Sequence, residues 1–251
     1  MFENLLNRQE YDANAKTMSS DFFRNVYTYM FVALGLSGGI AYYIGAGESI
    51  TLANGHKLPL LFIKLFISES GGLSPLFWVV ALAPVGLGWL IQSSYNRFSM
   101  STLTLLFAIY SILMGLSLSV IFIRYDLGSI TSTFFVSAGA FAGMAILGYT
   151  TKTDLTKFGS LLFMVFIGIF IAGIVNIFLK NDTMGFVIAA LGVFVFTGLT
   201  AYQMQQLKHI SNDPNLEGVE RNKLALIGGL MLYILFINLF LSLLRLLGNR
   251  D

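Results

Sequence analysis

Charged side chains are scarce in this sequence, and their scarcity sets the class of protein. Only 11% of the residues are Asp, Glu, Lys or Arg, whereas 56% are hydrophobic. Soluble domains carry roughly 25% charged residues, so this chain has too few to cover a surface that faces water. The net charge of +2 is small and the basic residues are dispersed, which excludes a nucleic-acid-binding surface. The composition predicts an integral membrane protein in contact with the lipid bilayer.

Cysteine is absent, and histidine occurs only at His56 and His209. The lack of cysteine excludes disulfides and thiolate chemistry. Two histidines leave few metal ligands and few general bases, and the His-Glu-x-x-His helix of zinc hydrolases is missing. We therefore expect no cofactor and no metal site.

Long hydrophobic runs, in contrast, are abundant. A helix needs about 20 mostly apolar residues to cross a bilayer. Seven windows meet this test, so the sequence predicts an all-α transmembrane bundle of seven helices within residues 25–251, after an N-terminal tail of residues 1–24. The predicted spans are Val26–Gly47, Leu76–Gln92, Leu103–Ile123, Ile130–Tyr149, Leu161–Leu179, Met184–Met204 and Leu224–Leu244.

Two local features depart from a regular span. The second window contains Pro84, which predicts a kink or break in that helix. The apolar run Leu58–Ile67 is too short to span and contains Lys64. We expect it to form an interfacial or hooked segment inside the loop Glu48–Ser74.

The distribution of Lys and Arg predicts the orientation. Nine basic residues fall on the side of the N-terminal tail and six on the opposite side. The positive-inside rule then places the N-terminus in the cytoplasm and the C-terminus outside. A re-entrant last segment would instead return the C-terminus to the cytoplasm.

Small residues at four-residue spacing predict where helices approach closely, because lipid supplies no hydrophobic drive for helix association. Gly35 with Gly39, and Gly139 with Gly143 followed by Gly148, form such pairs, and Gly115 shares a face with Ser119 on the third span. We interpret them as packing positions within the bundle, with a dimer interface as the alternative.

The predicted membrane interior contains no charge. None of the 13 carboxylates falls deep in a predicted span, and the basic residues behave in the same way. Ionisable residues inside a membrane usually mark functional sites, so this absence excludes an intramembrane aspartyl protease and argues against a proton-coupled carrier. No base accompanies a nucleophile at depth, and we expect no enzymatic activity.

The polar residues that remain at depth are neutral. The sixth span ends with Gln203 and Gln206, and along the last span Leu235, Asn238, Ser242 and Arg245 share one helix face. This face becomes polar towards the outer end. Either it lines an aqueous path, or Asn238 and Ser242 form hydrogen bonds that pack the helices. Candidate pore and gate residues are Gln203, Gln206, Leu235, Asn238, Ser242 and Arg245.

Five groups of short motifs, in order from the first span to the last, resemble the Bax inhibitor-1 family of membrane proteins. They are Asn25-Val-Tyr-Thr-Tyr-Met with Ser37-Gly-Gly-Ile-Ala-Tyr, Ser117-Leu-Ser-Val-Ile-Phe, Gly148-Tyr-Thr-Thr-Lys-Thr-Asp-Leu, Phe196-Thr-Gly-Leu-Thr-Ala-Tyr, and Phe236-Ile-Asn-Leu-Phe-Leu with Leu243-Leu-Arg-Leu-Leu-Gly. The resemblance implies seven helices with the last at the centre of the other six. It also implies a pH-regulated Ca²⁺ leak across the membrane, or, as in some bacterial relatives, a link to a membrane protease.

The sequence departs from the family at the pH-sensitive pair of aspartates. Gln203 and Leu235 occupy those two positions. Two carboxylates can share a proton and switch near neutral pH, and they offer Ca²⁺ the charged oxygens it prefers. Without them the proton switch is lost, Ca²⁺ would bind only weakly as a permeant ion, and Leu235 is interpreted as an apolar constriction that gates by dewetting.

Two functional hypotheses follow. The first is a cation leak channel that lacks the titratable latch. The second is a regulator without transport activity that binds another membrane protein, such as a protease, through the charged loop Lys208–Lys223. The short form of the chain suits a bacterial inner membrane.

Overall fold

The computed structural model describes residues 2–51, 57–68, 72–216 and 218–249, with the backbone alone for 2–16 and 57. The chain divides into two compact units. The first comprises Met1–Met30 and Ser137–Leu246, and the second comprises Phe31–Val136 and Leu247–Asp251. We call them the large and the small unit.

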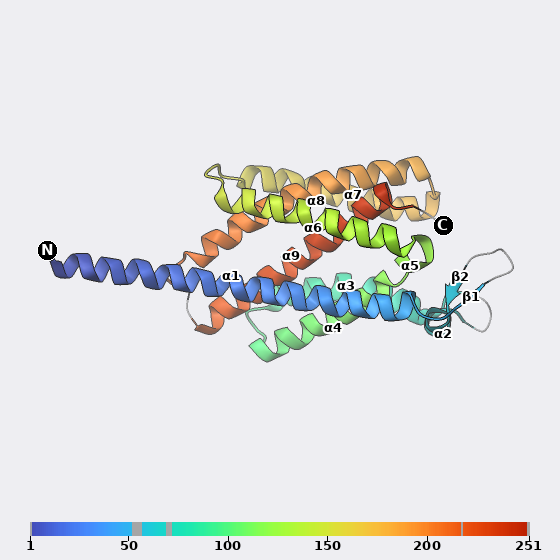
Figure 1. Ribbon diagram of the computed structural model, residues 1–251, viewed down its shortest axis with the longest axis horizontal. Coiled ribbons are helices and arrows are strands. Elements are labelled where there is room, and N and C mark those ends of the chain that lie inside the picture. The colour runs from blue at the N-terminus through green and yellow to red at the C-terminus, as the bar shows by residue number, and fades with distance from the viewer. Residues whose placement is uncertain (1, 52–56, 69–71, 217, 250–251) are drawn as a thin grey trace. The chain divides into compact units, whose positions relative to one another are not determined.

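Helices account for almost all of the described structure, and two short strands form the exception (Figure 1). The elements are α1 (Phe2–Gly45), β1 (Ser49–Thr51), β2 (Lys57–Pro59), α2 (Leu60–Phe66), α3 (Pro75–Ser94), α4 (Met100–Leu118), α5 (Ile121–Arg124), α6 (Leu127–Thr150), α7 (Thr156–Leu179), α8 (Asp182–Ser211) and α9 (Gly218–Leu247).

The prediction of seven spans is confirmed. Among the described residues, seven helical segments are long and apolar enough to cross a membrane, and they correspond one to one with the predicted windows. In its most apolar window, α9 is 61% buried, the largest share of the seven. A well-covered last helix suits the expected central position, which stays a prediction.

The large unit contains the first part of α1, the end of α6, and α7, α8 and α9. Helices α7 and α8 lie side by side (Figure 1). A buried cluster of Leu162, Val195 and Leu199 joins them. Glycines permit close helix contacts elsewhere in this unit: a Cβ added to Gly229 would lie 2.8 Å from the carbonyl oxygen of Val26 on α1.

The small unit is built on the rest of α1 with α3 and α4, which lie side by side (Figure 1). Helix α2 follows the hairpin of β1 and β2, and it buries Phe62 and Phe66 against Ile44 and Val80. The expected hooked segment Leu58–Ile67 is therefore packed into a hydrophobic core and is not merely interfacial. Its aromatic side chains drive this burial because each removes a large apolar area from water.

Helix α3 continues through Pro84, so the predicted break is absent, whereas the predicted kink stays a prediction. The prediction of close packing at Gly35–Gly39 and Gly139–Gly143 was wrong. A Cβ added at any of these glycines would meet no heavy atom within 4 Å among the described residues of its own unit. Two other predicted packing positions do make close contacts: a Cβ added to Gly115 would lie 2.7 Å from the Ser37 carbonyl oxygen, and one added to Gly148 would lie 2.6 Å from the Ala201 Cα.

Candidate functional site

The polar face of α9 is held by hydrogen bonds within its own helix. Asn238 Nδ2 donates to the Ile234 carbonyl at 2.8 Å, and Ser242 Oγ donates to the Asn238 carbonyl at 2.7 Å. Such bonds to the preceding turn satisfy polar side chains without a partner from another helix. Both side chains are half-buried, and these bonds satisfy the Ser242 hydroxyl proton and one of the two N–H groups of the Asn238 amide.

Helix α8 covers the outer part of this face with small residues. Gly185, Ala189 and Gly192 are buried and lie on one side of α8. A Cβ added to Gly192 would lie 2.6 Å from Ser242 Oγ, and one added to Gly185 would lie 2.7 Å from Arg245 Cζ. Ser242 and Arg245 thus pack against α8. The hydrogen bonds of Asn238 and Ser242 described above stay within α9, whereas the packing alternative expects bonds to neighbouring helices, and pore lining stays a prediction.

Leu235 belongs to an apolar cluster. It packs with Tyr202 against the buried side chains of Leu162, Val195 and Leu199. A carboxylate at this position would be surrounded by hydrocarbon, where an unpaired charge is strongly disfavoured. The position therefore suits leucine and opposes the entry of water.

Gln203 and Gln206 are half-buried on α8, and both share a helix face with Leu199. Their neighbour Gln205 is buried and makes two bonds that sequence reasoning did not foresee. Its Oε1 accepts from the Leu155 backbone N–H at 2.8 Å, and its Nε2 donates to the Thr153 carbonyl at 2.8 Å. Gln205 thereby ties the connection between α6 and α7 to α8.

Lys208, one turn beyond, strengthens the same junction. Its Nζ donates to the Tyr149 carbonyl at 2.7 Å and lies 5.2 Å from the centroid of the Tyr149 ring. The backbones of α6 and α8 meet closely here, since a Cβ added to Gly148 would lie 2.6 Å from the Ala201 Cα. The motif Gly148–Leu155 and the end of α8 thus pack directly against each other and are joined by hydrogen bonds.

Asp154 begins the turn that enters α7. Its Oδ1 accepts from the Thr156 backbone N–H at 2.9 Å. Hydrogen bonds from the hydroxyl and the backbone of Thr156 lower the pKa of the Asp154 carboxyl, because they stabilise the ionised form. This carboxylate therefore stays charged at neutral pH and serves the local turn.

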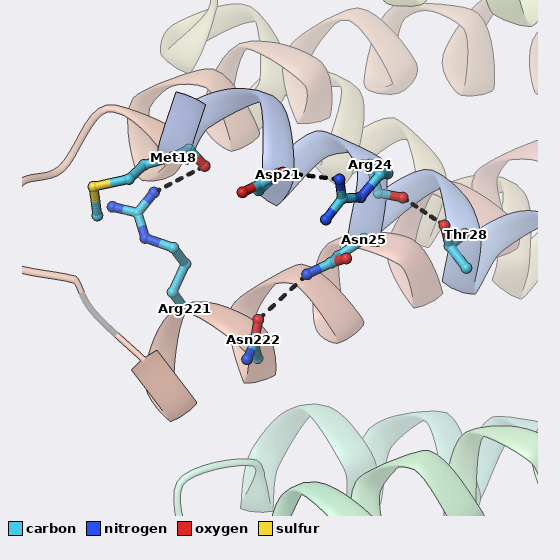
Figure 2. A network of polar contacts seen from close by, with 7 residues as sticks. All are labelled: Met18, Asp21, Arg24, Asn25, Thr28, Arg221 and Asn222. Carbon is cyan, nitrogen blue, oxygen red and sulfur yellow. Dashed lines mark hydrogen bonds and ion pairs between the residues drawn. The ribbon is translucent and has the colours of Figure 1, made fainter. Parts of the chain in front are cut away.

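Arg221, at the start of α9, binds four backbone carbonyls, of which Figure 2 shows that of Met18. Its guanidinium donates to Leu216 at 2.8 Å, Asp213 at 3.0 Å, Ser211 at 3.1 Å and Met18 at 3.4 Å. The fixed fork of donors in arginine suits this kind of multiple contact. Arg221 thus joins the α8–α9 connection to α1.

The ends of α1, α6 and α8 border a groove of about 630 Å³ in the large unit. Its wall is aromatic and apolar over part of its length and hydroxyl-bearing over the rest; it is lined by Ser19, Ser20, Phe23, Tyr27, Ala145, Ile146, Tyr149, Met204 and Asn212. A volume of this size is typical of small-molecule sites.

No cluster of three or more His, Cys, Asp or Glu residues occurs in the part of the chain that the structure describes. The polar groups near Leu235 are amides and hydroxyls, which offer a cation neutral oxygens only. Such oxygens hold Ca²⁺ less firmly than carboxylates do.

Comparison with known proteins places the chain among bacterial membrane proteins. Residues 19–251 match the family described as "Inhibitor of apoptosis-promoting Bax1". Inner membrane protein YbhL of Escherichia coli K12 is 39% identical over 231 residues, which cover 91% of this chain and 92% of that protein. A protein of Borreliella burgdorferi is 46% identical over 174 residues, 69% of this chain and 75% of its own. A protein of Caulobacter vibrioides is 39% identical over 237 residues, 92% of this chain and 89% of its own.

Proposed function

This chain belongs to the Bax inhibitor family of multi-pass membrane proteins, and we propose that it is a cation leak channel closed by an apolar plug at Leu235. The observation that carries the proposal is the packing of Leu235 and Tyr202 against Leu162, Val195 and Leu199. Polar residues adjoin this cluster along both helices: Gln203 follows Tyr202 on α8, and Asn238 lies one turn beyond Leu235 on α9.

An apolar level between polar levels is a recognised way to gate a pore, since a narrow hydrocarbon constriction excludes water and hence ions. In relatives that carry aspartates at the Gln203 and Leu235 positions, protonation can change the charge of the same level. This chain has no carboxylate at either position, so its gate responds to hydration and packing and not to a shared proton near neutral pH.

Ion flux into liposomes tests the proposal. The purified protein is reconstituted with a Ca²⁺-sensitive dye inside the vesicles, and flux is measured between about pH 6 and 8, the range over which a carboxylate pair would titrate. We expect a low flux from the parent chain that does not change with pH. Leu235→Asn should raise the flux several-fold without pH dependence, because an amide wets the plug.

The pair Gln203→Asp with Leu235→Asp is the decisive variant. It should conduct in a pH-dependent way, because the two carboxylates share a proton. Gln206→Asp is the matched control. It adds a single carboxylate three residues after Gln203 on α8 and should lack this response. Absence of flux from every variant that stays folded by circular dichroism would overturn the channel.

The second candidate is a regulator without transport activity. It is favoured by the closed polar face of α9, where Asn238 and Ser242 bond to their own helix and Gly185 and Gly192 cover Arg245 and Ser242. A bundle whose polar face is covered in this way would not conduct ions and would act through a membrane-protein partner. Silent flux assays combined with a specific crosslinked partner in native membranes would support it.

We also propose that the N-terminus is cytoplasmic and the C-terminus external in the bacterial inner membrane. The natural lack of cysteine makes single-cysteine labelling direct. Lys152→Cys in the exposed α6–α7 connection should react with a membrane-impermeant maleimide only after permeabilisation, whereas Asn249→Cys should react in intact spheroplasts. The reverse pattern would invert the proposed topology, and labelling of both only after permeabilisation would indicate a re-entrant last segment.

A further inference from the structure

We propose that the groove bordered by α1, α6 and α8 binds one anionic phospholipid, with the headgroup at its polar end and an acyl chain along its apolar end. This site is separate from the residues around Leu235, and the inference does not depend on conduction. It stands on four features of the groove: its polarity gradient, its cation, its rigid walls and its position in the membrane.

The polarity of the lining changes along the groove in the direction expected for a lipid. Ser19 and Ser20 precede the predicted first span Val26–Gly47, and Asn212 follows the end of α8. Deeper along the same helices, the lining consists of side chains such as Met204 and Ile146. The hydroxyl and amide groups therefore lie at the membrane boundary and the hydrocarbon side chains lie within the span.

Lys208 supplies positive charge at the polar end. Met204, Lys208 and Asn212 are spaced four residues apart, so Lys208 lies on the same face of α8 as two residues that line the groove. Its ammonium has three donors, and one of them binds the Tyr149 carbonyl at 2.7 Å. The contact fixes the ammonium beside a lining residue and leaves donors for a phosphate.

The walls at the polar end are tied together. Ser19 Oγ donates to Ser211 Oγ at 3.0 Å, which bridges α1 and the end of α8. Arg221 binds the carbonyls of Ser211 and Asp213, which flank Asn212. It also binds the carbonyl of Met18, which precedes Ser19 (Figure 2). A site whose walls are held in place pays less ordering entropy when it binds.

The carboxylate nearest in sequence to the serines does not oppose an anion. Asp21 pairs with Arg24 at 3.0 Å (Figure 2), so its charge is balanced on α1. Lys208 and Arg221 add further positive charge around the polar end. A second carboxylate, Asp213, follows Asn212, and its Oδ1 accepts from the backbone and side-chain N–H groups of Asn215 at 2.9 and 3.1 Å. Lys208 and Arg221 outnumber this carboxylate, so the charge around the polar end favours an anionic headgroup.

The position of the groove selects a lipid as its occupant. Two helices end at it, α6 at Thr150 and α8 at Ser211, and the predicted first span begins beside it at Val26. In a bilayer this level is the headgroup region on the side of the N-terminal tail. Phospholipids are the amphipathic molecules present there at high concentration, and basic side chains at this level attract the anionic ones.

Native mass spectrometry of the detergent-purified full chain tests the site with dimyristoyl phosphatidylglycerol and dimyristoyl phosphatidylcholine. We expect phosphatidylglycerol to bind more tightly. Lys208→Gln should weaken its binding about fivefold, since one lysine near an anionic lipid surface contributes ~1 kcal/mol, and should leave phosphatidylcholine binding unchanged. Lys157→Gln, at an exposed position on α7, is the matched control and should bind both lipids like the parent.

Ser20→Trp provides a second variant that keeps the charge. Ser20 is exposed at the mouth of the groove, so an indole there should block both lipids without disturbing the core. Equal affinity of the parent for the two lipids would overturn the proposal. So would an unchanged affinity for phosphatidylglycerol in both Lys208→Gln and Ser20→Trp. Displacement of the lipid by excess soluble glycerol phosphate would assign the site to a free phosphate and overturn the lipid.

Discussion

Gly148→Ala is expected to destabilise the protein by about 3 kcal/mol, the upper part of the range for overpacking a close contact. Gly148 on α6 faces the backbone of α8, and an added Cβ would lie 2.6 Å from Ala201 Cα and 2.7 Å from its carbonyl carbon. Backbone atoms cannot rotate away as a flexible side chain can. The two helices must therefore separate, and the bonds of Gln205 and Lys208 to the α6–α7 connection weaken with them.

Gly143→Ala is the matched control on the same helix. An added Cβ at Gly143 would meet no described heavy atom within 4 Å, and alanine improves helix propensity by up to about 1 kcal/mol over glycine. Circular dichroism during titration with sodium dodecyl sulfate measures both free energies of unfolding. Equal losses from the two substitutions would contradict the close α6–α8 contact.

Gln205→Leu should cost about 1–3 kcal/mol, because two backbone groups lose part-buried hydrogen bonds that each contribute about 0.5–1.5 kcal/mol. These groups are the N–H of Leu155 and the carbonyl of Thr153, each bound at 2.8 Å. Leucine has a volume similar to glutamine, so the loss would reflect hydrogen bonding and not a cavity. The same denaturant titration measures the change.

Gln206→Leu supplies the comparison for this prediction. Gln206 is half-buried one residue further along α8, and we expect its substitution to change the free energy of unfolding by less than about 1 kcal/mol, as for other side chains outside a buried network. Faster hydrogen exchange in residues 151–155 should accompany Gln205→Leu alone. Parental exchange in that segment would contradict the role of Gln205 as a tie.

Sequence reasoning located the helices well and the contacts between them poorly. The windows of about 20 apolar residues matched the helices because span formation depends on local composition. The glycine pairs did not follow so simply. Four-residue spacing puts Gly139 and Gly143 on one face of α6, but the backbone of α8 meets this helix at Gly148, and spacing contains no information about that neighbour.

The candidate site shows the same division. The shared face of Leu235, Asn238, Ser242 and Arg245 follows from the period of a helix. The partners of that face, Gly185 and Gly192 on α8, come from a span whose glycines sequence reasoning passed over. Among the three glutamines near the end of α8, Gln203 and Gln206 are the predicted pore residues. It is Gln205, however, that makes the hydrogen bonds to the backbone of Leu155 and Thr153. Nothing in the local sequence distinguishes them.

By itself, the sequence determined that this protein is a seven-span helical membrane protein of the Bax inhibitor family with no charge deep in its predicted spans. These properties are sums over contiguous residues, or identities at single positions such as Gln203 and Leu235, and they need no knowledge of the fold. The tertiary structure alone decided that Leu235 lies in an apolar cluster, that Gln205 ties the α6–α7 connection to α8, and that Ser19, Tyr149 and Met204 border one groove. Each of these depends on segments far apart in the chain, and only packing determines which of their faces meet.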